Sequence, residues 1–218
     1  MNVILVEPGE IQDGCVTLTG DRARHVRSVL RAAIGQAIRV GVLNGPLGAG
    51  VVQALDEHHV QLACRWDETL PPRPPVDLLL AVPRPKVLNR LWAQLAAMGV
   101  GRIILTNAER VERPYFDTHV LGEAHYRPLL IEGLQQARDT RLPLVTVHRR
   151  FRVLLEDELD ALSDAGVRIV PDKKSEADAS STSPLPGCGC SLCQPVVSDD
   201  ACQTDADCGP SPPYTCSR

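Results

Sequence analysis

The first 70 residues alternate between short apolar runs and turn residues, a pattern typical of strands joined by tight turns. Strands are predicted at residues 3–6, 15–19, 38–42, 51–55 and 60–66. After the second strand, apolar residues recur at three- and four-residue steps from Ala23 to Ala33 and predict one helix, which Gly35 ends. Several short strands with a single helix predict a small β-barrel over residues 1–70.

A proline-rich linker at residues 71–75 separates this part from a longer alternation of strands and helices. The apolar run at 77–82 predicts a strand buried on both faces. Further strands are predicted at 102–106, 144–147 and 167–170, and helices at 87–98, 121–138 and 152–165. The fold class is therefore α/β, with a mostly parallel sheet, helices on both faces, and a ligand expected outside the carboxyl ends of the strands.

Composition changes abruptly after residue 171. Six of the eight Cys lie in residues 172–218, and seven acidic against three basic residues there account for the whole net charge of −4. The Ser, Pro, Gly and Asp content predicts a disordered tail, because too little apolar surface is available to offset the entropy of ordering. Three interpretations remain open: a zinc site around Cys188, Cys190 and Cys193, a secreted disulfide scaffold, or unrelated sequence from a frameshift, fusion or assembly fault.

Several classes of protein are disfavoured. No apolar run reaches the roughly 18 residues of a membrane-spanning helix, and the start lacks the basic region of a secretory signal. We therefore expect no membrane association and a cytoplasmic location. Phosphate-loop, dinucleotide-binding, Gly-x-Ser-x-Gly and His-Glu-x-x-His motifs are absent, which argues against the common nucleotide-binding and hydrolase classes. No metal site is predicted in residues 1–171, since His58 and His59 are adjacent on a strand and point to opposite faces.

Basic residues gather where a nucleic-acid backbone could bind. Arg24, Arg27 and Arg31 share one face of the predicted helix, with His25 on its flank. Residues 71–152 contain 13 basic and seven acidic residues. The basic residues in loops after strands are Arg84, Lys86, Arg110, Arg113, Arg149, Arg150 and Arg152. Salt-dependent binding of nucleic acid and a merely solvated basic surface both explain this pattern.

Four sequence blocks resemble the RsmE-type methyltransferase family. Residues 21–36 resemble its HHL-x-x-VLR…G opening, residues 79–86 its first strand and lysine-bearing loop, residues 95–103 its helix-to-strand joint, and residues 133–143 its A-x-EQ-x-x-R-x-x-x-P block. The resemblance implies a PUA-like barrel joined to a SPOUT domain at residues 76–171, whose parallel sheet ends in a knot. It also implies N3-methylation of a uridine in 16S ribosomal RNA of the small ribosomal subunit, S-adenosylmethionine as donor, and a homodimer.

The resemblance further implies roles for single residues. RNA contacts fall on Arg22, Arg24, His25, Arg27, Arg31, Arg84 and Gln136. Lys86 and Arg138 are the implied catalytic residues. A permanently charged guanidinium such as that of Arg138 suits the anion that forms when uracil loses its N3 proton. The alternative is that Arg138 is a helix-end charge paired with Glu132 or Asp139.

The resemblance stops after residue 170. The family's Gly-Pro-Glu-Gly-Gly and Leu-Gly…Leu-Arg-x-Glu-Thr-Ala segments, which form the donor-binding knot, do not occur in the sequence. No cofactor-binding residue is therefore assigned, and the sheet is expected to expose an apolar edge. Two hypotheses follow: a truncated or chimeric uridine-N3 methyltransferase that binds RNA but lacks its donor site, or a non-catalytic RNA-binding module whose Cys-rich tail binds a metal or a partner.

Overall fold

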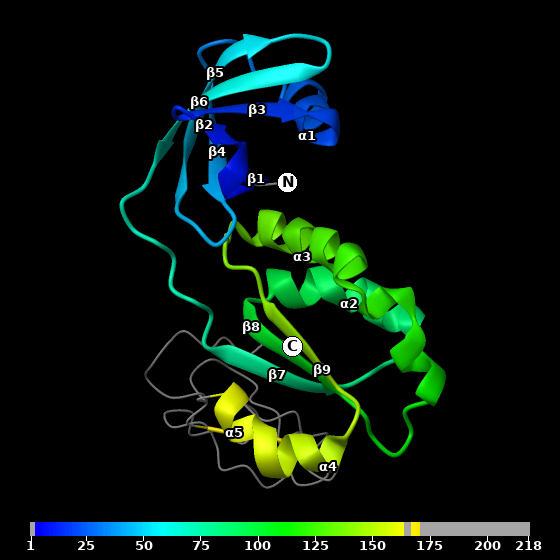
Figure 1. The fold of residues 1–218 in the computed structure, drawn as a ribbon. Coiled ribbons are helices and arrows are strands. Elements are labelled where there is room, and N and C mark those ends of the chain that lie inside the picture. Colours follow the sequence, from blue (N-terminus) through cyan, green and yellow to red (C-terminus); the bar gives the residue numbers. More distant parts are fainter. Residues whose placement is uncertain (1–2, 164–166, 171–218) are drawn as a thin grey trace, which may run out of the picture. The chain divides into compact units, whose positions relative to one another are not determined.

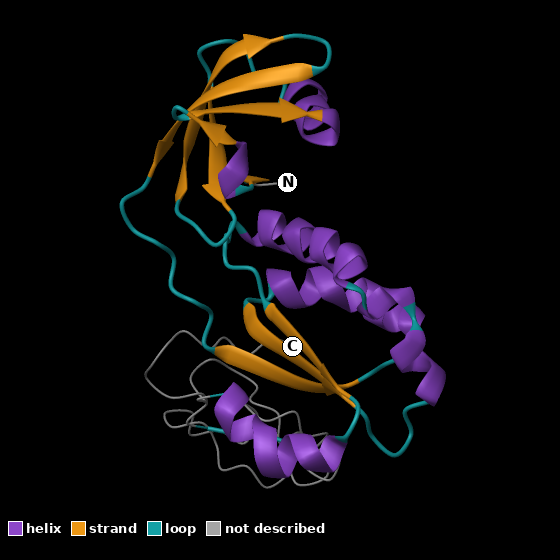
Figure 2. Ribbon diagram, in the orientation of Figure 1, coloured by secondary structure: helices purple, strands orange, loops and turns teal. Residues whose placement is uncertain are grey.

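The computed structural model describes residues 3–163 and 167–170. These residues form a curled six-stranded sheet followed by a three-stranded parallel sheet with helices (Figure 1, Figure 2). Both sheets belong to one compact unit, residues 1–166. The predicted α/β fold class, with a barrel-like part followed by a parallel α/β part, is confirmed.

The curled sheet has the strand order β1-β4-β5-β6-β3-β2. Its strands are β1 (Ile4–Val6), β2 (Ile11–Gln12), β3 (Cys15–Thr19), β4 (Ala37–Val42), β5 (Leu47–Leu55) and β6 (His59–Trp66). Only the β1–β4 pair is parallel. Alternate residues such as Leu18, Val40 and Leu62 are fully buried, so the period-two pattern of the sequence becomes the inner and outer faces of the barrel.

The barrel helix is shorter than the sequence predicts. Helix α1 (Gly20–Arg24) continues into a π-helical turn, His25–Val29, and both bury Ala23 and Val26 against the barrel core. Arg31 then adopts a left-handed backbone with φ of 49°, and the Ala32 N–H donates to the Val26 carbonyl. The predicted helical face therefore ends before Arg31, and Val29 is largely exposed.

The second sheet has the order β7-β8-β9, with all strands parallel. Its strands are β7 (Val76–Ala81), β8 (Val100–Thr106) and β9 (Leu144–His148), and helices α2 (Pro85–Ala97) and α3 (Glu123–Ala137) connect them. Short 3-10 turns at Arg113–Asp117 and His119–Leu121 precede α3. Ile103 and Leu105 of β8 are buried in the core that contains α2 and α3. The indole of Trp92 in that core donates to the Val120 carbonyl at 3.2 Å.

Two sequence predictions for the second sheet are wrong. Residues 167–170 form no strand, and Val167, Ile169 and Val170 are 78–87% exposed. A strand forms only where a neighbour offers hydrogen bonds, and the described sheet ends at β9. Strand β7 is not buried on both faces either, because it is an edge strand and leaves Val76 and Leu79 partly exposed.

The predicted helix at 152–165 is present in pieces. It comprises α4 (Phe151–Val153), a π-helical turn at Leu154–Glu158, and α5 (Leu159–Leu162). In Figure 1 these elements, coloured yellow, lie on the other side of the sheet from α2 and α3. The predicted disordered tail at 172–218 lies outside the described residues. No helix within the described ranges is long and apolar enough to cross a membrane.

Helices α2 and α3 pack closely at Gly133. A Cβ atom at this buried position would lie 2.9 Å from the Ala96 Cβ and closer still to the Ala93 carbonyl oxygen. Because that oxygen belongs to the backbone of α2, the two helices would have to separate to admit a methyl group. Glycine at this position therefore sets the distance between the helices.

A second set of contacts joins the barrel to the segment after α3. The Asn44 N–H donates to the Thr140 carbonyl at 2.7 Å, and the Thr140 hydroxyl donates to the Gly45 carbonyl at 2.6 Å. The Leu142 N–H donates to the Asn44 side-chain oxygen at 3.0 Å, and Arg141 Nε donates to the Pro71 carbonyl at 2.6 Å. Thr140 is fully buried, so its hydrogen bonds have no competition from water. We call these contacts the 44–140 junction.

We predict that Gly133→Ala lowers the free energy of unfolding by about 1–3 kcal/mol, because the added methyl overpacks the α2–α3 contact. Chemical denaturation of the full chain measures the change. Gly9→Ala is the matched control, since nothing lies within 4 Å of a Cβ at that position. Equal stabilities of the two variants would contradict the tight contact.

Replacing Thr140 with Val keeps the shape of the side chain but removes the donor to Gly45. We expect a loss of about 1–3 kcal/mol in unfolding free energy, because the carbonyl of Gly45 is left without its buried partner. The exposed Thr69 provides the control, and Thr69→Val is expected to change stability by less than about 0.5 kcal/mol. If Thr140→Val left the free energy of unfolding unchanged, the hydroxyl would not stabilise the junction.

Candidate functional site

The carboxyl edge of the parallel sheet gathers basic and aromatic side chains from three loops. Arg84 is the N-cap residue of α2, and Lys86 lies in the first turn of that helix. Both are exposed. The loop after β8 contributes Tyr115 and Phe116, and the segment after β9 contributes Arg149. These residues lie where parallel α/β sheets bind their ligands.

Arg149 ties two of these loops together. Its Nη2 donates to Asp117 Oδ1 at 2.7 Å and to the Phe116 carbonyl at 3.3 Å. Its guanidinium carbon also lies 5.3 Å from the centre of the Phe116 ring, within the range of a cation–π contact. The loop after β8 is thus held against the end of β9 by one arginine, although the ion pair is largely exposed and contributes little stability.

Tyr115 lies between the carboxylate of Glu112 and the guanidinium of Arg84. Its hydroxyl donates to Glu112 Oε1 at 2.8 Å, and this hydrogen bond raises the pKa of Tyr115 while the nearby Arg84 opposes the shift. Tyr115 therefore stays protonated at neutral pH. The interaction of Arg84 with Tyr115 places the Arg84 side chain at the loop after β8, on the same rim as Lys86.

The face of the sheet away from α2 and α3 contains a polar cluster that the sequence analysis missed. Thr106 pairs in register with His148, and Thr146 lies two residues earlier on β9, so the three side chains share one face. His148 Nδ1 lies 2.6 Å from Glu158 Oε2, while His148 Nε2 and both threonine hydroxyls are buried with no hydrogen-bond partner among the described residues. The threonines interrupt apolar runs, which is the signal that could have revealed them.

Arg138 and Gln136 lie at the opposite edge of the sheet. Asn89 contacts His125 near the start of both helices, and Gly133 packs against Ala93 and Ala96 further along, so α2 and α3 run parallel. Lys86 at the start of α2 and Arg138 after the end of α3 are therefore roughly 18 Å apart along the helix axes. The structure does not bring the two implied catalytic residues together within one chain.

Most of the barrel arginines implied to contact RNA already have protein partners. Arg22 forms a two-armed ion pair with Glu10, one arm of which is 2.9 Å long, and also donates to the Leu5 carbonyl. The pKa of Glu10 is lowered, chiefly by this hydrogen bond from Arg22. Arg24 pairs with Asp21 at 2.9 Å, and Arg27 donates to the backbone carbonyls of the turn at 56–57. RNA contact by these residues stays a prediction.

The other two barrel residues differ in exposure. His25 is half-buried at the C-cap of α1, whereas Arg31 is exposed on its left-handed turn. The common face expected for Arg24, Arg27 and Arg31 is broken, because the change to a π-helical turn and the φ of Arg31 redirect the chain.

The charges at the carboxyl edge decide whether it can hold a sulfonium methyl donor. Such a donor is cationic at sulfur and is held best by carbonyl or carboxylate oxygens. The rim of this edge presents Arg84, Lys86 and Arg149, and its carboxylates Glu112 and Asp117 are already bonded to Tyr115 and Arg149. The described residues at this edge therefore suit a phosphate backbone and do not fit the donor. No step through the donor is derived from them.

Comparisons of the sequence and of the structure with known proteins all point to RNA methyltransferases. The RNA methyltransferase domain family matches residues 71–187, more than half of the chain. Ribosomal RNA small subunit methyltransferase E of Treponema pallidum is 29% identical over 168 residues, which cover 76% of this chain and 63% of that protein. The chain thus spans less than two thirds of the length of this relative.

Solved structures share the fold at low sequence identity. A probable rRNA methyltransferase from Porphyromonas gingivalis is 17% identical with a TM-score of 0.58, covering 72% of this chain and 64% of that one. Ribosomal RNA small subunit methyltransferase E from Neisseria gonorrhoeae, solved bound to S-adenosyl methionine, is 17% identical with a TM-score of 0.51, covering 71% and 66%. With its barrel, its parallel sheet and its matching RNA methyltransferase domain, the chain belongs to the RsmE-type family of RNA methyltransferases.

Proposed function

We propose that this chain holds small-subunit ribosomal RNA as part of an RsmE-type methyltransferase, whose target is N3 of a uridine and whose donor is S-adenosylmethionine. The match of the RNA methyltransferase domain over residues 71–187 carries the proposal. Such a substrate places the protein in the cytoplasm with the small ribosomal subunit. The cationic carboxyl edge supports it further, because a phosphate backbone needs unshielded positive charge.

The chemistry of the target base explains why cations at this edge are useful. Loss of the N3 proton leaves negative charge shared by N3 and the two carbonyl oxygens of uracil, and a nearby cation stabilises that charge. Lys86 and Arg84 are exposed at the edge where a nucleotide would bind, so we assign the role to this pair. Arg138 lies at the other edge and serves the same site only if a second subunit brings it there, which is consistent with a homodimer.

This chain lacks the sequence segments with which the family binds its methyl donor. The family's two knot segments do not occur in residues 1–218, and the described carboxyl edge does not fit a sulfonium. S-adenosylmethionine supplies the methyl group in this family when it is bound. In our proposal the residues of this chain orient the RNA and stabilise the uracil anion, and they do not by themselves hold the donor.

Calorimetric titration of the full chain with S-adenosylmethionine tests the donor side. We expect no binding at micromolar donor, and no transfer of labelled methyl groups to unmodified 16S ribosomal RNA. A relative that contains both knot segments is the positive control in both assays. Micromolar affinity for the donor would contradict the assignment and would direct the search for its site to residues outside the described ranges.

A double variant tests the RNA side. Arg84→Gln with Lys86→Gln is expected to weaken binding of 16S ribosomal RNA roughly tenfold and to flatten the dependence of log affinity on log salt, because phosphate contacts are lost. Arg73→Gln with Arg90→Gln removes the same charge from exposed positions outside this edge and is the matched control. Equal affinities of the two double variants would show that the edge does not hold RNA.

A further inference from the structure

Two exposed arginines face the same side of the barrel, on strands far apart in sequence. Arg39 of β4 pairs in register with Ala49 of β5, and Ala49 pairs in turn with Arg65 of β6. Register partners share a face of the sheet, so both arginines project outward on either side of a small side chain. Their Cβ atoms are about two strand spacings apart, roughly 10 Å.

Both arginines line one hollow on the surface of the barrel. Its volume is about 390 Å³, and its other lining residues include Leu47, Ala49, Trp66 and Asp67. Gly48 contributes to the shape, since a Cβ there would lie 2.9 Å from a ring carbon of Trp66. Small residues at 48 and 49 thus keep open the trough that the arginines flank. We call it the 39–65 trough.

The charges of the trough are not neutralised by the protein. Within residues 3–163 and 167–170, the side chains of Arg39 and Arg65 have no hydrogen bond or ion pair, in contrast to those of Arg22, Arg24 and Arg27 in the barrel helix. Asp67 is the acidic group that lines the trough, so two guanidinium groups oppose one carboxylate. A phosphodiester suits this site, because guanidinium groups bind phosphate oxygens through paired donors.

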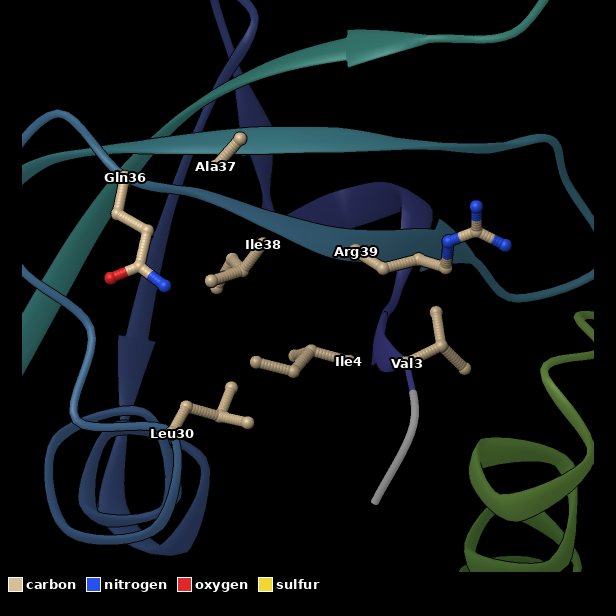
Figure 3. Close-up of a pocket in the computed structure, with 7 residues that line it drawn as sticks. All are labelled: Val3, Ile4, Leu30, Gln36, Ala37, Ile38 and Arg39. Atoms are coloured by element: carbon tan, nitrogen blue, oxygen red, sulfur yellow. The ribbon is translucent and has the colours of Figure 1, made fainter.

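A second hollow, whose lining is partly polar and partly apolar, shares Ala37, Ile38 and Arg39 with the trough. Its volume is about 210 Å³. In Figure 3 the side chains of Ile4, Leu30 and Ile38 point toward one another, while the Arg39 guanidinium points away from them. Gln36 stands at the rim, and its amide oxygen accepts the Ala33 N–H, which leaves the amide nitrogen to donate. An unpaired nucleobase has an apolar face and polar edges, and this hollow offers both kinds of surface, from Leu30 and from Gln36.

We propose that the 39–65 trough binds one phosphodiester of a single-stranded RNA segment, whose neighbouring base lies in the second hollow beside Arg39. The proposal deepens the proposed function, on which it rests for the identity of the ligand. It assigns RNA contact to the outer face of β4, β5 and β6, in addition to the barrel helix and the carboxyl edge of the parallel sheet.

Arg39→Gln with Arg65→Gln in the full chain tests the trough. We expect binding of a single-stranded uridine-rich 20-mer to weaken roughly tenfold, and the slope of log affinity against log salt to fall by about 0.7 for one lost phosphate contact. Asp67→Asn is expected to act in the opposite direction and to tighten binding about twofold. The Arg73→Gln, Arg90→Gln variant removes equal charge and controls for the overall field, and thermal melting confirms that each variant folds.

Other outcomes would overturn the proposal. Loss of affinity equal to that of the charge-matched control would mean that the trough contributes only to the general field. Equal effects of the variant on binding of a duplex and of the single strand would exclude a base in the second hollow. An effect on binding of inorganic phosphate without an effect on RNA would make the trough a site for free anions.

The outcome also separates this proposal from the proposed function. If the unmodified chain binds no RNA, the proposed function fails. If it binds RNA and responds to changes at Arg84 and Lys86 but not to changes at Arg39 and Arg65, the trough alone is wrong.

Discussion

Thr140 is buried between the end of α3 and the start of β9, and its hydroxyl and carbonyl both bond to the barrel turn at residues 44–45. Water cannot replace these bonds, so the turn and the strand entry form or break together. The same contact packs the Thr140 methyl against Gly41, where no larger residue than glycine would fit. Around it, Val3, Leu5 and Leu43 of the barrel share one core with Trp92, Leu130 and Leu134 of the helices. The barrel and the parallel sheet are therefore one folding unit, in spite of the proline linker.

The junction also places the functional residues. Because it fixes the segment after α3 at the amino edge of the sheet, Arg138 is held beside the barrel turn, while α2 carries Lys86 to the carboxyl edge. Parallel packing of α2 and α3 around Gly133 then keeps the two apart by the length of a helix. The sequence blocks that contain Lys86 and Arg138 both resemble the family, but the two residues are far apart in the fold of one chain. In our proposal, a site that uses both residues is therefore formed by two chains.

Alternation in the sequence predicted the strands well, since the bounds of β3 agree with the prediction and those of β6 and β9 agree to within one residue. Features that depend on distant partners were not predictable. The φ of Arg31 ends the barrel helix early, and residues 167–170 lack the neighbour that would make them a strand. The pairing of Arg22 with Glu10 crosses from the helix to a turn, and the 39–65 trough depends on a register across three strands. Local pattern contains none of this information.

The distribution of charge likewise could not be interpreted from the sequence alone. Residues 1–171 contain 20 basic and 20 acidic residues, so net charge gives no reason for this part to attract RNA. Pairing changes the result, because within the predicted stripe Arg24 pairs with Asp21 and Arg27 donates to the carbonyls of residues 56–57. By contrast, Arg39, Arg65 and Lys86 remain without ion pairs among the described residues. Unpaired cations exchange condensed counterions for phosphate contacts, and paired ones must first break an existing bond. In our proposal the RNA-binding surface is therefore determined by which arginines the fold leaves unpaired, and the number of arginines in a sequence block is a poor guide to it.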